Sequence, residues 1–311
     1  MAYNRRALQE RRRQSNEPRK LRRLEQMQSS KAMAGLIGYG IQGSSSPQIH
    51  EAEAAAQGFD LVYRIIDFAQ PERDLSFLPA LLQSAESIGF AGLNVTHPYK
   101  EDAYKQVDTL SKEAEEIGSI NTIVFRDGKR QGDNTDWSGF SENLRSTLPD
   151  ADLSAVALVG TGGAGLAVAY GLLKLGTQDL RLFDTDQVRA SKLQQHLAKN
   201  FPDRKIAVSQ SPAEALDGVN GVVNATPVGM EGHDGMPVEK KLLQPTMWVA
   251  DIVWFPLETQ LLKTARELGC KVCGGGGMAV RQAALSFKQF FQTEPDVDRM
   301  LKRFVDATKK A

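Results

Sequence analysis

Val156-Ala157-Leu158-Val159-Gly160-Thr161-Gly162-Gly163-Ala164-Gly165 is the stretch that decides the fold of this chain. Four apolar residues in a row predict a buried strand, and residues 166–175 after the glycines predict a helix. A G-x-G-x-x-G pattern between strand and helix lets the backbone turn tightly and approach a pyrophosphate, which the helix N-terminus attracts. We therefore predict a Rossmann-type dinucleotide-binding domain; a glycine-rich turn used only for packing is the alternative. The loop residues expected to bind the cofactor are Gly160, Gly162, Gly163, Ala164 and Gly165.

Asp184 is the residue expected to choose the cofactor. It ends the next predicted strand, 24 residues after Gly160, where a carboxylate accepts hydrogen bonds from the adenosine ribose. A carboxylate there repels a 2′-phosphate, and Asp186 adds a second negative charge, so NAD is predicted and NADP is the alternative. No Lys or Arg follows directly, and Arg189 is the nearest cation. A simple turn role for Asp184 is the other interpretation.

A complete α/β unit precedes the glycine loop, which is an unusual order. Strands are predicted at 34–39, 61–66, 92–95 and 121–125, and helices at 46–58, 75–88, from 98 and at 111–117. This alternation predicts a largely parallel sheet. We expect a leader over 1–33, a substrate-binding domain over 34–135 and a Rossmann domain over 136–278. The predicted helices within 279–311 are expected to pack back and complete the first domain.

Composition limits the remaining possibilities. The 311 residues, with 41% hydrophobic and 24% charged content, suit a soluble globular protein of two domains. Residues 1–33 carry ten Lys or Arg against three Glu, a balance of +7, and no apolar run. This segment is therefore neither a signal peptide nor a membrane anchor. A disordered or weakly helical leader is predicted, and a nucleic-acid-binding arm is the alternative.

The only two cysteines, Cys270 and Cys273, form a C-x-x-C pair. Zinc would need a second pair of ligands, but the four histidines are scattered singly, so no metal site is predicted. The pair lies on a predicted short strand, where residues i and i+3 face opposite sides, which disfavours a disulfide. Structural cysteines in a reducing cytoplasm are expected.

Lys100 and Asp136 are the candidates for acid–base chemistry. If a dinucleotide accepts a hydride from an alcohol, a base must remove the hydroxyl proton. A lysine can do so where its surroundings favour the neutral amine, and the start of a helix acts in that direction. Asp136, at the start of the inter-domain helix, can orient that amine. Taken alone, each residue is equally compatible with a surface lysine or an ordinary helix-capping aspartate.

Seven short motifs follow one another between about residues 34 and 295. They are Ser44-Ser45-Ser46-Pro47, Asn94-Val95-Thr96-x-Pro98-x-Lys100, Ile120-Asn121-Thr122, Asn134-Thr135-Asp136, Asn224-Ala225-Thr226-Pro227-x-Gly229-Met230, Asp251-Ile252-Val253-Trp254-x-Pro256 and Gly277-Met278-x-x-x-Gln282. As an ordered set they resemble the shikimate/quinate dehydrogenase family. That resemblance implies a substrate domain and a Rossmann domain with a cleft between them.

The resemblance also implies roles for individual residues. Lys100 and Asp136 resemble the catalytic pair, and Ser44 and Ser46 the hydroxyls that bind the substrate carboxylate. Those that resemble ligands of the ring hydroxyls are Thr96, Asn121 and Gln282. Those that resemble cofactor-binding residues outside the glycine loop are Thr226, Gly277 and Met278, the last two lining the nicotinamide. His97 stands at a variable position, and Trp254 replaces the family's usual tyrosine.

The Thr-His-Pro-Tyr-Lys sequence and the acidic strand end most resemble the NAD-dependent quinate/shikimate branch. This implies oxidation of quinate, shikimate or both to 3-dehydroquinate or 3-dehydroshikimate, in quinate catabolism and in the cytoplasm. The expected partner is the small-molecule substrate, without a membrane or nucleic acid, and the expected state is a monomer or homodimer. The alternatives are an NADP-dependent biosynthetic shikimate dehydrogenase, an aminoshikimate-type relative, or a non-catalytic ligand sensor. The presence of Lys100, Asp136 and the glycine loop disfavours the sensor.

Overall fold

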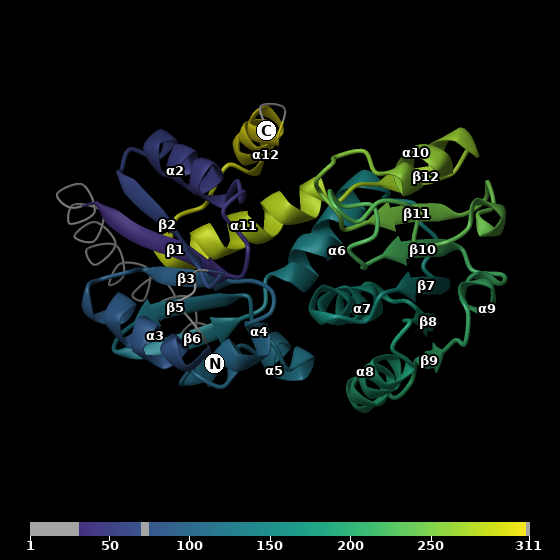
Figure 1. The fold of residues 1–311 in the computed structure, drawn as a ribbon, viewed down its shortest axis with the longest axis horizontal. Coiled ribbons are helices and arrows are strands. Elements are labelled where there is room, and N and C mark those ends of the chain that lie inside the picture. Colours follow the sequence, from purple (N-terminus) through teal and green to yellow (C-terminus); the bar gives the residue numbers. More distant parts are fainter. Residues whose placement is uncertain (1–30, 70–74, 309–311) are drawn as a thin grey trace, which may run out of the picture.

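The computed structural model describes residues 31–69 and 75–308. Most of the predicted leader (1–30) and residues 309–311 lie outside these ranges. The described chain forms two α/β lobes that lie side by side and are joined by α6 (Asp136–Thr147) and α11 (Gly276–Phe291) (Figure 1). The predicted α/β class with two domains is confirmed. Within the described ranges, no helix is long and apolar enough to span a membrane.

The sheet of the first lobe has the strand order β2-β1-β3-β5-β6-β4. Its strands are β1 (Ala32–Gly38), β2 (Leu61–Asp67), β3 (Gly92–Val95), β4 (Thr109–Leu110), β5 (Thr122–Arg126) and β6 (Lys129–Asp133). The expectation of parallel pairing holds for β2, β1 and β3, whereas β5 runs antiparallel to both β3 and β6. The turn at Asp127 and Gly128, whose φ angles are 53° and 67°, forms a two-residue hairpin that makes β5 and β6 antiparallel.

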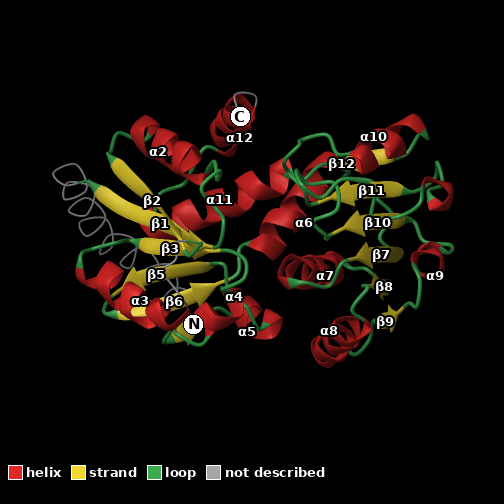
Figure 2. Ribbon diagram, in the orientation of Figure 1, coloured by secondary structure: helices red, strands yellow, loops and turns green. Residues whose placement is uncertain are grey.

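Helices cover both faces of this first sheet (Figure 2). They are α2 (Ser46–Ala56), α3 (Leu78–Ser87), α4 (Lys100–Tyr104), α5 (Lys112–Ile117) and the short 3-10 helix η1 (Leu75–Phe77). Alternate strand residues point to opposite faces. Ile37 therefore packs with the cluster that includes α3, whereas the neighbouring Leu36 packs with the cluster that includes α11.

The sheet of the second lobe is parallel throughout, in the order β12-β11-β10-β7-β8-β9. Its strands are β7 (Ala155–Val159), β8 (Asp179–Phe183), β9 (Lys205–Val208), β10 (Gly221–Asn224), β11 (Trp248–Asp251) and β12 (Lys271–Cys273). The first strand, β7, is central, and the order reverses between β7 and β10. This is the strand order of a dinucleotide-binding Rossmann sheet.

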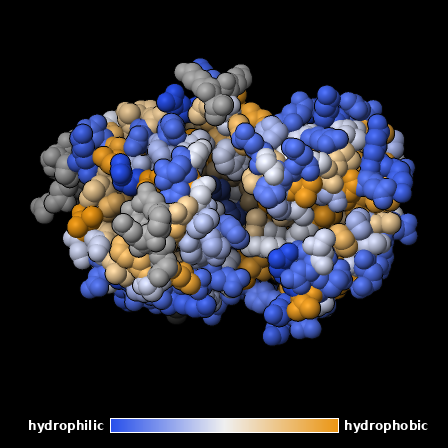
Figure 3. Space-filling view, viewed as in Figure 1, coloured by the Kyte–Doolittle hydropathy of each residue, from blue (hydrophilic) through white to orange (hydrophobic). Residues whose placement is uncertain are grey.

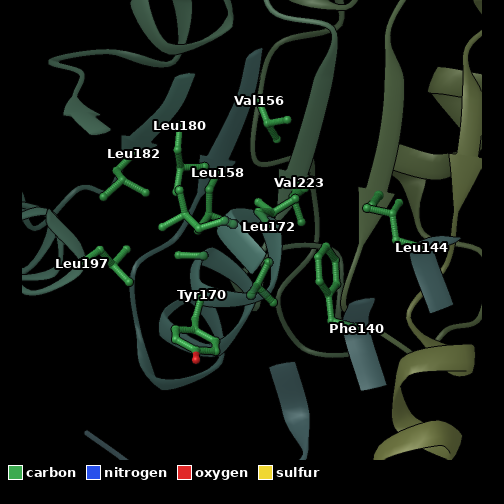
Figure 4. Packing of buried hydrophobic residues seen from close by; sticks show 14 of the residues in the cluster. Phe140, Leu144, Val156, Leu158, Tyr170, Leu172, Leu180, Leu182, Leu197 and Val223 are labelled. Atoms are coloured by element: carbon green, nitrogen blue, oxygen red, sulfur yellow. The ribbon is translucent and has the colours of Figure 1, made fainter. Parts of the chain in front are cut away.

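The core of the second lobe follows from the alternation along β7. Val156 and Leu158 pack toward α7 and α8 (Figure 4), whereas Ala157 and Val159 pack toward α9 and α10. The helices of this lobe are α7 (Gly163–Leu175), α8 (Gln187–Asn200), α9 (Pro212–Leu216), α10 (Gln260–Glu267) and the 3-10 helix η2 (Lys240–Leu242). Both faces of the sheet are thereby buried, as parallel sheets require.

The end of the chain returns to the first lobe. Phe287 and Phe290 of α11 are fully buried in the same cluster as Leu36 of β1. The last helix, α12 (Val297–Thr308), packs Met300 and Phe304 with Ile49 of α2. The first lobe is therefore built from two segments that are distant in the sequence.

Helix α5 of the first lobe also attaches to the second lobe. Ile117, at its C-terminal end, is 1% exposed and belongs to the core cluster that contains α7 and α8. The main-chain carbonyl of Glu116 contacts His196 Nε2 at 2.7 Å and accepts a hydrogen bond from Asn200 Nδ2 at 2.9 Å. The Tyr170 hydroxyl donates to the Glu116 carboxylate. The lobes are thus in contact through α5 as well as through the joining helices.

Candidate active site

Lys100 and Asp136 form an ion pair at the junction of the lobes. Lys100 is the first residue of α4, two residues later than the predicted helix start, and Asp136 is the first residue of α6. Lys100 Nζ lies 2.5 Å from Asp136 Oδ2, and the two side chains are only 14% and 11% exposed. The fold therefore brings together two charges that the sequence separates by 36 residues. Figure 3 shows that the surface is hollowed between the lobes that α6 joins.

Asn121 contacts the second oxygen of Asp136 and also Gln282. Asn121 Nδ2 lies 3.0 Å from Asp136 Oδ1 and 3.3 Å from Gln282 Oε1. Gln282 comes from α11, so the site combines residues of the first lobe with the returning C-terminal helix. Gly139 of α6 allows α11 to lie this close, because a Cβ at position 139 would be 2.8 Å from the main-chain nitrogen of Gln282. Of the three residues predicted to bind ring hydroxyls, Asn121 thus contacts the ion pair and Gln282 contacts Asn121.

The three predicted hydroxyl residues lie after neighbouring strand ends. Ser44 Oγ donates to Ser46 Oγ at 3.0 Å, in the loop that leads from β1 into α2. Thr96 directly follows β3, which pairs with β1. Its methyl group lies so close to Gly38 that a Cβ there would be 2.5 Å away. Carboxyl ends of parallel strands are the usual place for a ligand in such folds.

The glycine loop has the geometry that a pyrophosphate needs. Gly160 has φ +96°, and a Cβ there would lie 2.7 Å from the Ala225 backbone; a Cβ on Gly165 would lie 2.2 Å from the Gly160 carbonyl. Gly162 and Gly163, by contrast, would meet nothing within 4 Å. Gly160 and Gly165 are thus needed for close packing of the backbone. Gly162 and Gly163 leave the N-terminus of α7 open to a ligand.

Asp184 does not have the free, uncompensated carboxylate that the sequence suggested. It is 5% exposed and accepts hydrogen bonds from Thr161 N at 2.7 Å, Thr161 Oγ1 at 2.8 Å and Asp186 N at 2.9 Å. Arg189 pairs with it through Nη2 at 2.7 Å and Nε at 3.2 Å. Burial acts to raise the pKa of Asp184, but the hydrogen bonds, led by that of Arg189, outweigh it and bring the pKa to about 2.

The expectation that no adjacent cation offsets Asp184 is therefore wrong. Arg189 lies in the first turn of α8, whose N-terminus is capped by Asp186, and this turn directs its guanidinium back to the strand end. The guanidinium is 49% exposed, so it remains accessible from the surface. Asp184 thus anchors the glycine loop through Thr161 and also holds the guanidinium of Arg189 at the end of β8.

The other predicted cofactor residues are partly occupied by contacts within the fold. The Thr226 hydroxyl donates to Asn224 Oδ1 at 2.7 Å and accepts from the Val228 nitrogen at 3.2 Å, so it has no further proton to donate. A Cβ on Gly277 would overlap Asn143 of α6, which explains the glycine by helix packing. Met278 is 7% exposed, in the core cluster of the second lobe. Their contacts with a cofactor remain predictions.

His97 and Trp254 take different positions. His97 is exposed, in the turn before α4. Trp254 is partly buried, and its ring centroid lies 5.6 Å from that of Phe304 in α12, so it supports the returning helix. Cys270 and Cys273 are both free and buried, and the predicted strand there is confirmed as β12. In the described part of the chain, no group of three metal-ligating side chains is found.

Residues of the site network that were not selected as site residues from the sequence include Tyr63, Asn94, Thr122, Thr135 and Arg189. Thr122 and Thr135 flank predicted site residues and bond to Asn121 at 3.0 Å and 2.7 Å. Proximity to a motif was therefore the available signal for them. Tyr63 stands in an ordinary apolar strand, and Arg189 in a polar helix, so neither carries a local signal.

A Rossmann sheet with a glycine loop lies next to a second α/β lobe, and a Lys–Asp pair lies at their junction. These features are those of the class of two-domain dinucleotide-binding proteins. Residues 36–123 match the shikimate dehydrogenase substrate binding domain, and residues 134–276 match the ThiF family. The chain is 44% identical to a shikimate dehydrogenase (NADP(+)) of Streptomyces avermitilis, over 86% of this chain and 93% of that relative. It is 43% identical to a quinate/shikimate dehydrogenase (NAD(+)) of Corynebacterium efficiens, over 90% and 99%.

Solved structures agree with these relatives. The quinate dehydrogenase of Corynebacterium glutamicum, in complex with NAD, has a TM-score of 0.84 and 40% identity, covering 89% of this chain and 99% of that one. The chain belongs to the shikimate/quinate dehydrogenase family.

Proposed function

We propose that this protein oxidises quinate, shikimate or both, with NAD as the hydride acceptor, to the corresponding 3-dehydro compounds. The observation that carries the proposal is the largely buried Lys100–Asp136 pair, which the neutral side chain of Asn121 contacts and to which Gln282 is linked through Asn121. Neutral donors and acceptors suit the hydroxyls of a polyol, and the two serine hydroxyls suit its carboxylate. Relatives that cover nearly the whole chain carry this activity in their names.

In this mechanism Lys100 acts as the general base. It takes the proton of the substrate hydroxyl, and Asp136, whose Oδ2 lies 2.5 Å from Nζ, stabilises the charge that Lys100 then carries. Asn121 donates to the other Asp136 oxygen at 3.0 Å and so keeps that carboxylate oriented. NAD, when bound, would supply the acceptor for the hydride of the same carbinol carbon. One hydride, which carries both electrons, and one hydroxyl proton thus leave the substrate, which becomes a ketone.

The residues of the second lobe fit such a cofactor. The open face at Gly162 and Gly163 admits a pyrophosphate to the N-terminus of α7, where free N–H groups favour its negative charge. Ala164 lies in the same first turn of α7. Asp184 directly follows the next strand, β8, and the side chain of Arg189 from α8 pairs with it there. The adenosine ribose is expected at this strand end.

A second candidate is the NADP-dependent oxidoreduction of shikimate. It is favoured by Arg189, because this half-exposed guanidinium offsets Asp184 where a 2′-phosphate would arrive. Relatives named for NADP are as similar to this chain as those named for NAD.

Initial rates with quinate and shikimate, each with NAD and NADP, test the proposal directly. We expect turnover with NAD and at least one of the two acids. Turnover of shikimate with NADP alone would establish the second candidate, and no turnover in any combination would reject both.

The serine pair should govern substrate affinity rather than chemistry. Ser44→Ala and Ser46→Ala each remove a donor that binds ground state and transition state alike, so KM should rise while kcat changes little. A lost bond to a charged group is worth about 1.5–3 kcal/mol, so KM should rise about 10- to 100-fold. Steady-state kinetics measures this, with Ser84→Ala as the control, because Ser84 is exposed and bonds only within α3. An unchanged KM in both variants would mean that the carboxylate binds elsewhere.

We further propose that the enzyme works in the cytoplasm and consumes quinate. Two free, buried cysteines fit a reducing compartment, where thiols stay reduced. Growth of the source organism on quinate, with and without the gene, would test the catabolic role.

A further inference from the structure

Tyr63 is a buried polar residue for which the mechanism above has no role. It lies on β2 and is 4% exposed. Its hydroxyl donates to Asn94 Oδ1 on β3 at 2.8 Å, and β1 lies between these two strands. The phenol therefore reaches across β1. Buried polar groups are held in such an arrangement because an unpaired one is costly.

The orientation of Asn94 fixes the direction of this bond. Asn94 Nδ2 lies 3.3 Å from the main-chain carbonyl of Asn121 and 3.1 Å from Thr122 Oγ1. A carbonyl can only accept, so the amide nitrogen must face it and the amide oxygen must face Tyr63. The Tyr63 proton is therefore committed to Asn94.

The same reasoning fixes the next link. The Thr135 main-chain nitrogen, which can only donate, lies 2.7 Å from Asn121 Oδ1. Asn121 Nδ2 is thus turned toward Asp136 Oδ1, at 3.0 Å. Between the two amides, the Thr122 hydroxyl accepts from Asn94 and donates to Asn121 Oδ1 at 3.0 Å. Each donor from Tyr63 onward points toward the catalytic carboxylate.

The serine pair lies beside this chain. Burial raises the pKa of the Tyr63 phenol, and the Ser46 side chain is close enough to oppose this rise. Ser46 in turn accepts from Ser44 at 3.0 Å. Tyr63 therefore stands between the serine pair and Asn94.

His50 holds the phenol ring in place. Its ring stacks on Tyr63 with a centroid distance of 4.5 Å and an interplanar angle of 21°. Burial lowers the pKa of His50 to about 3, so this imidazole is neutral at ordinary pH. Phe287 and Phe290 of α11 lie on the same histidine, at 6.0 and 6.5 Å. The phenol can therefore not turn to another partner without disturbing this aromatic cluster.

We propose that Tyr63 is a positioning residue that holds the Lys100–Asp136 pair in place through a chain of buried hydrogen bonds by way of Asn94, Thr122 and Asn121. It rests on the proposed function, because the chain ends at the catalytic pair named there. When a substrate carboxylate binds the neighbouring serines, Tyr63 keeps its own proton on Asn94. The alignment of Asn121 and Asp136 is thereby maintained during turnover.

The test is Tyr63→Phe, which keeps the ring and removes the hydroxyl. Asn94 Oδ1 then loses its donor, the amide is free to reorient, and Asn121 is less well aligned with Asp136. We expect kcat with quinate or shikimate to fall about tenfold, while KM for the acid and for NAD stays within about twofold. Ser46→Ala, by contrast, is expected to raise KM and to change kcat little. The control is Tyr104→Phe, a partly buried tyrosine of the same lobe that takes no part in the chain.

Asn94→Asp provides a second, independent test. The aspartate can still accept from Tyr63 but cannot donate to the Asn121 carbonyl, so it should reproduce the loss in kcat. The double variant should lose little more than either single one, as residues that act in one chain do. Circular dichroism verifies that each variant is folded.

Four outcomes are distinguishable. A kcat of Tyr63→Phe equal to that of Tyr104→Phe would overturn the inference, as would additive losses in the double variant. A higher KM with unchanged kcat would also overturn it, because Tyr63 would then serve the carboxylate site alone. An inactive wild-type protein with both acids and both cofactors would instead reject the proposed function.

Discussion

Lys100→Ala is expected to lower kcat by about 10²- to 10⁴-fold, the range for loss of a positioned acid–base group. The amine is the only proton acceptor that the ion pair offers besides Asp136, and alanine leaves nothing at the position of Nζ. Cofactor affinity should be unchanged, because the glycine loop belongs to the other lobe. Steady-state rates with NAD and fluorescence titration of bound NADH measure the two effects. Lys105→Ala is the matched control: its ammonium is 68% exposed and pairs only with Asp102 at 3.4 Å.

Asp136→Asn should lower kcat in the same direction, because an amide cannot stabilise the ammonium that Lys100 becomes. The double variant should be little slower than Lys100→Ala, since groups that act as a unit are not additive. Near wild-type kcat in Lys100→Ala would rule out this mechanism.

The second large effect concerns the cofactor. Asp184→Ser should shift the ratio of kcat/KM for NADP over NAD by about a hundredfold toward NADP. The substitution removes a negative charge, where like-charge opposition costs several kcal/mol. It also frees the Arg189 guanidinium, whose two bonds to Asp184 are 2.7 and 3.2 Å, to form a fork with a phosphate. Both cofactors should bind less tightly, because Thr161 loses its anchor, so the ratio is the quantity to measure.

Two further variants make this prediction specific. Arg189→Ala leaves Asp184 and Asp186 without a cation, so it should widen the preference for NAD. Asp179→Ser is the control, because it removes a carboxylate from the first residue of the same strand, where the partners are Arg181 and Lys205. A ratio that does not respond to Asp184→Ser would show that the adenosine ribose lies away from this strand end.

Much of the fold was predictable because its signals are local. The strand, glycine loop and helix at 156–175 are one continuous pattern, and their order identifies the Rossmann lobe. The antiparallel direction of β5 was indicated by Asp127 and Gly128, but alternation of strands and helices suggested a parallel sheet. A turn of two residues outweighed that general rule, since it leaves no room for a crossover.

The site was predictable where its residues form short motifs, as with Lys100, Asp136 and Asn121. It was not predictable where the partner depends on tertiary geometry. Arg189 reaches Asp184 only because Asp186 caps α8 and begins its first turn there. Tyr63 reaches Asn94 across β1 only because β2 and β3 are both neighbours of that strand. Neither relation is visible in residue spacing.

The attachment of α5 to the second lobe has a consequence for how the molecule denatures. Ile117 is a side chain of one lobe buried in the core of the other, and α11 contributes Met278 to one core and Phe287 to the opposite one. Neither core can therefore melt while the other stays complete. Scanning calorimetry should record a single endotherm whose calorimetric and van't Hoff enthalpies agree, although two-domain chains commonly show two. The two lobes should therefore unfold together as one cooperative unit, and not one after the other.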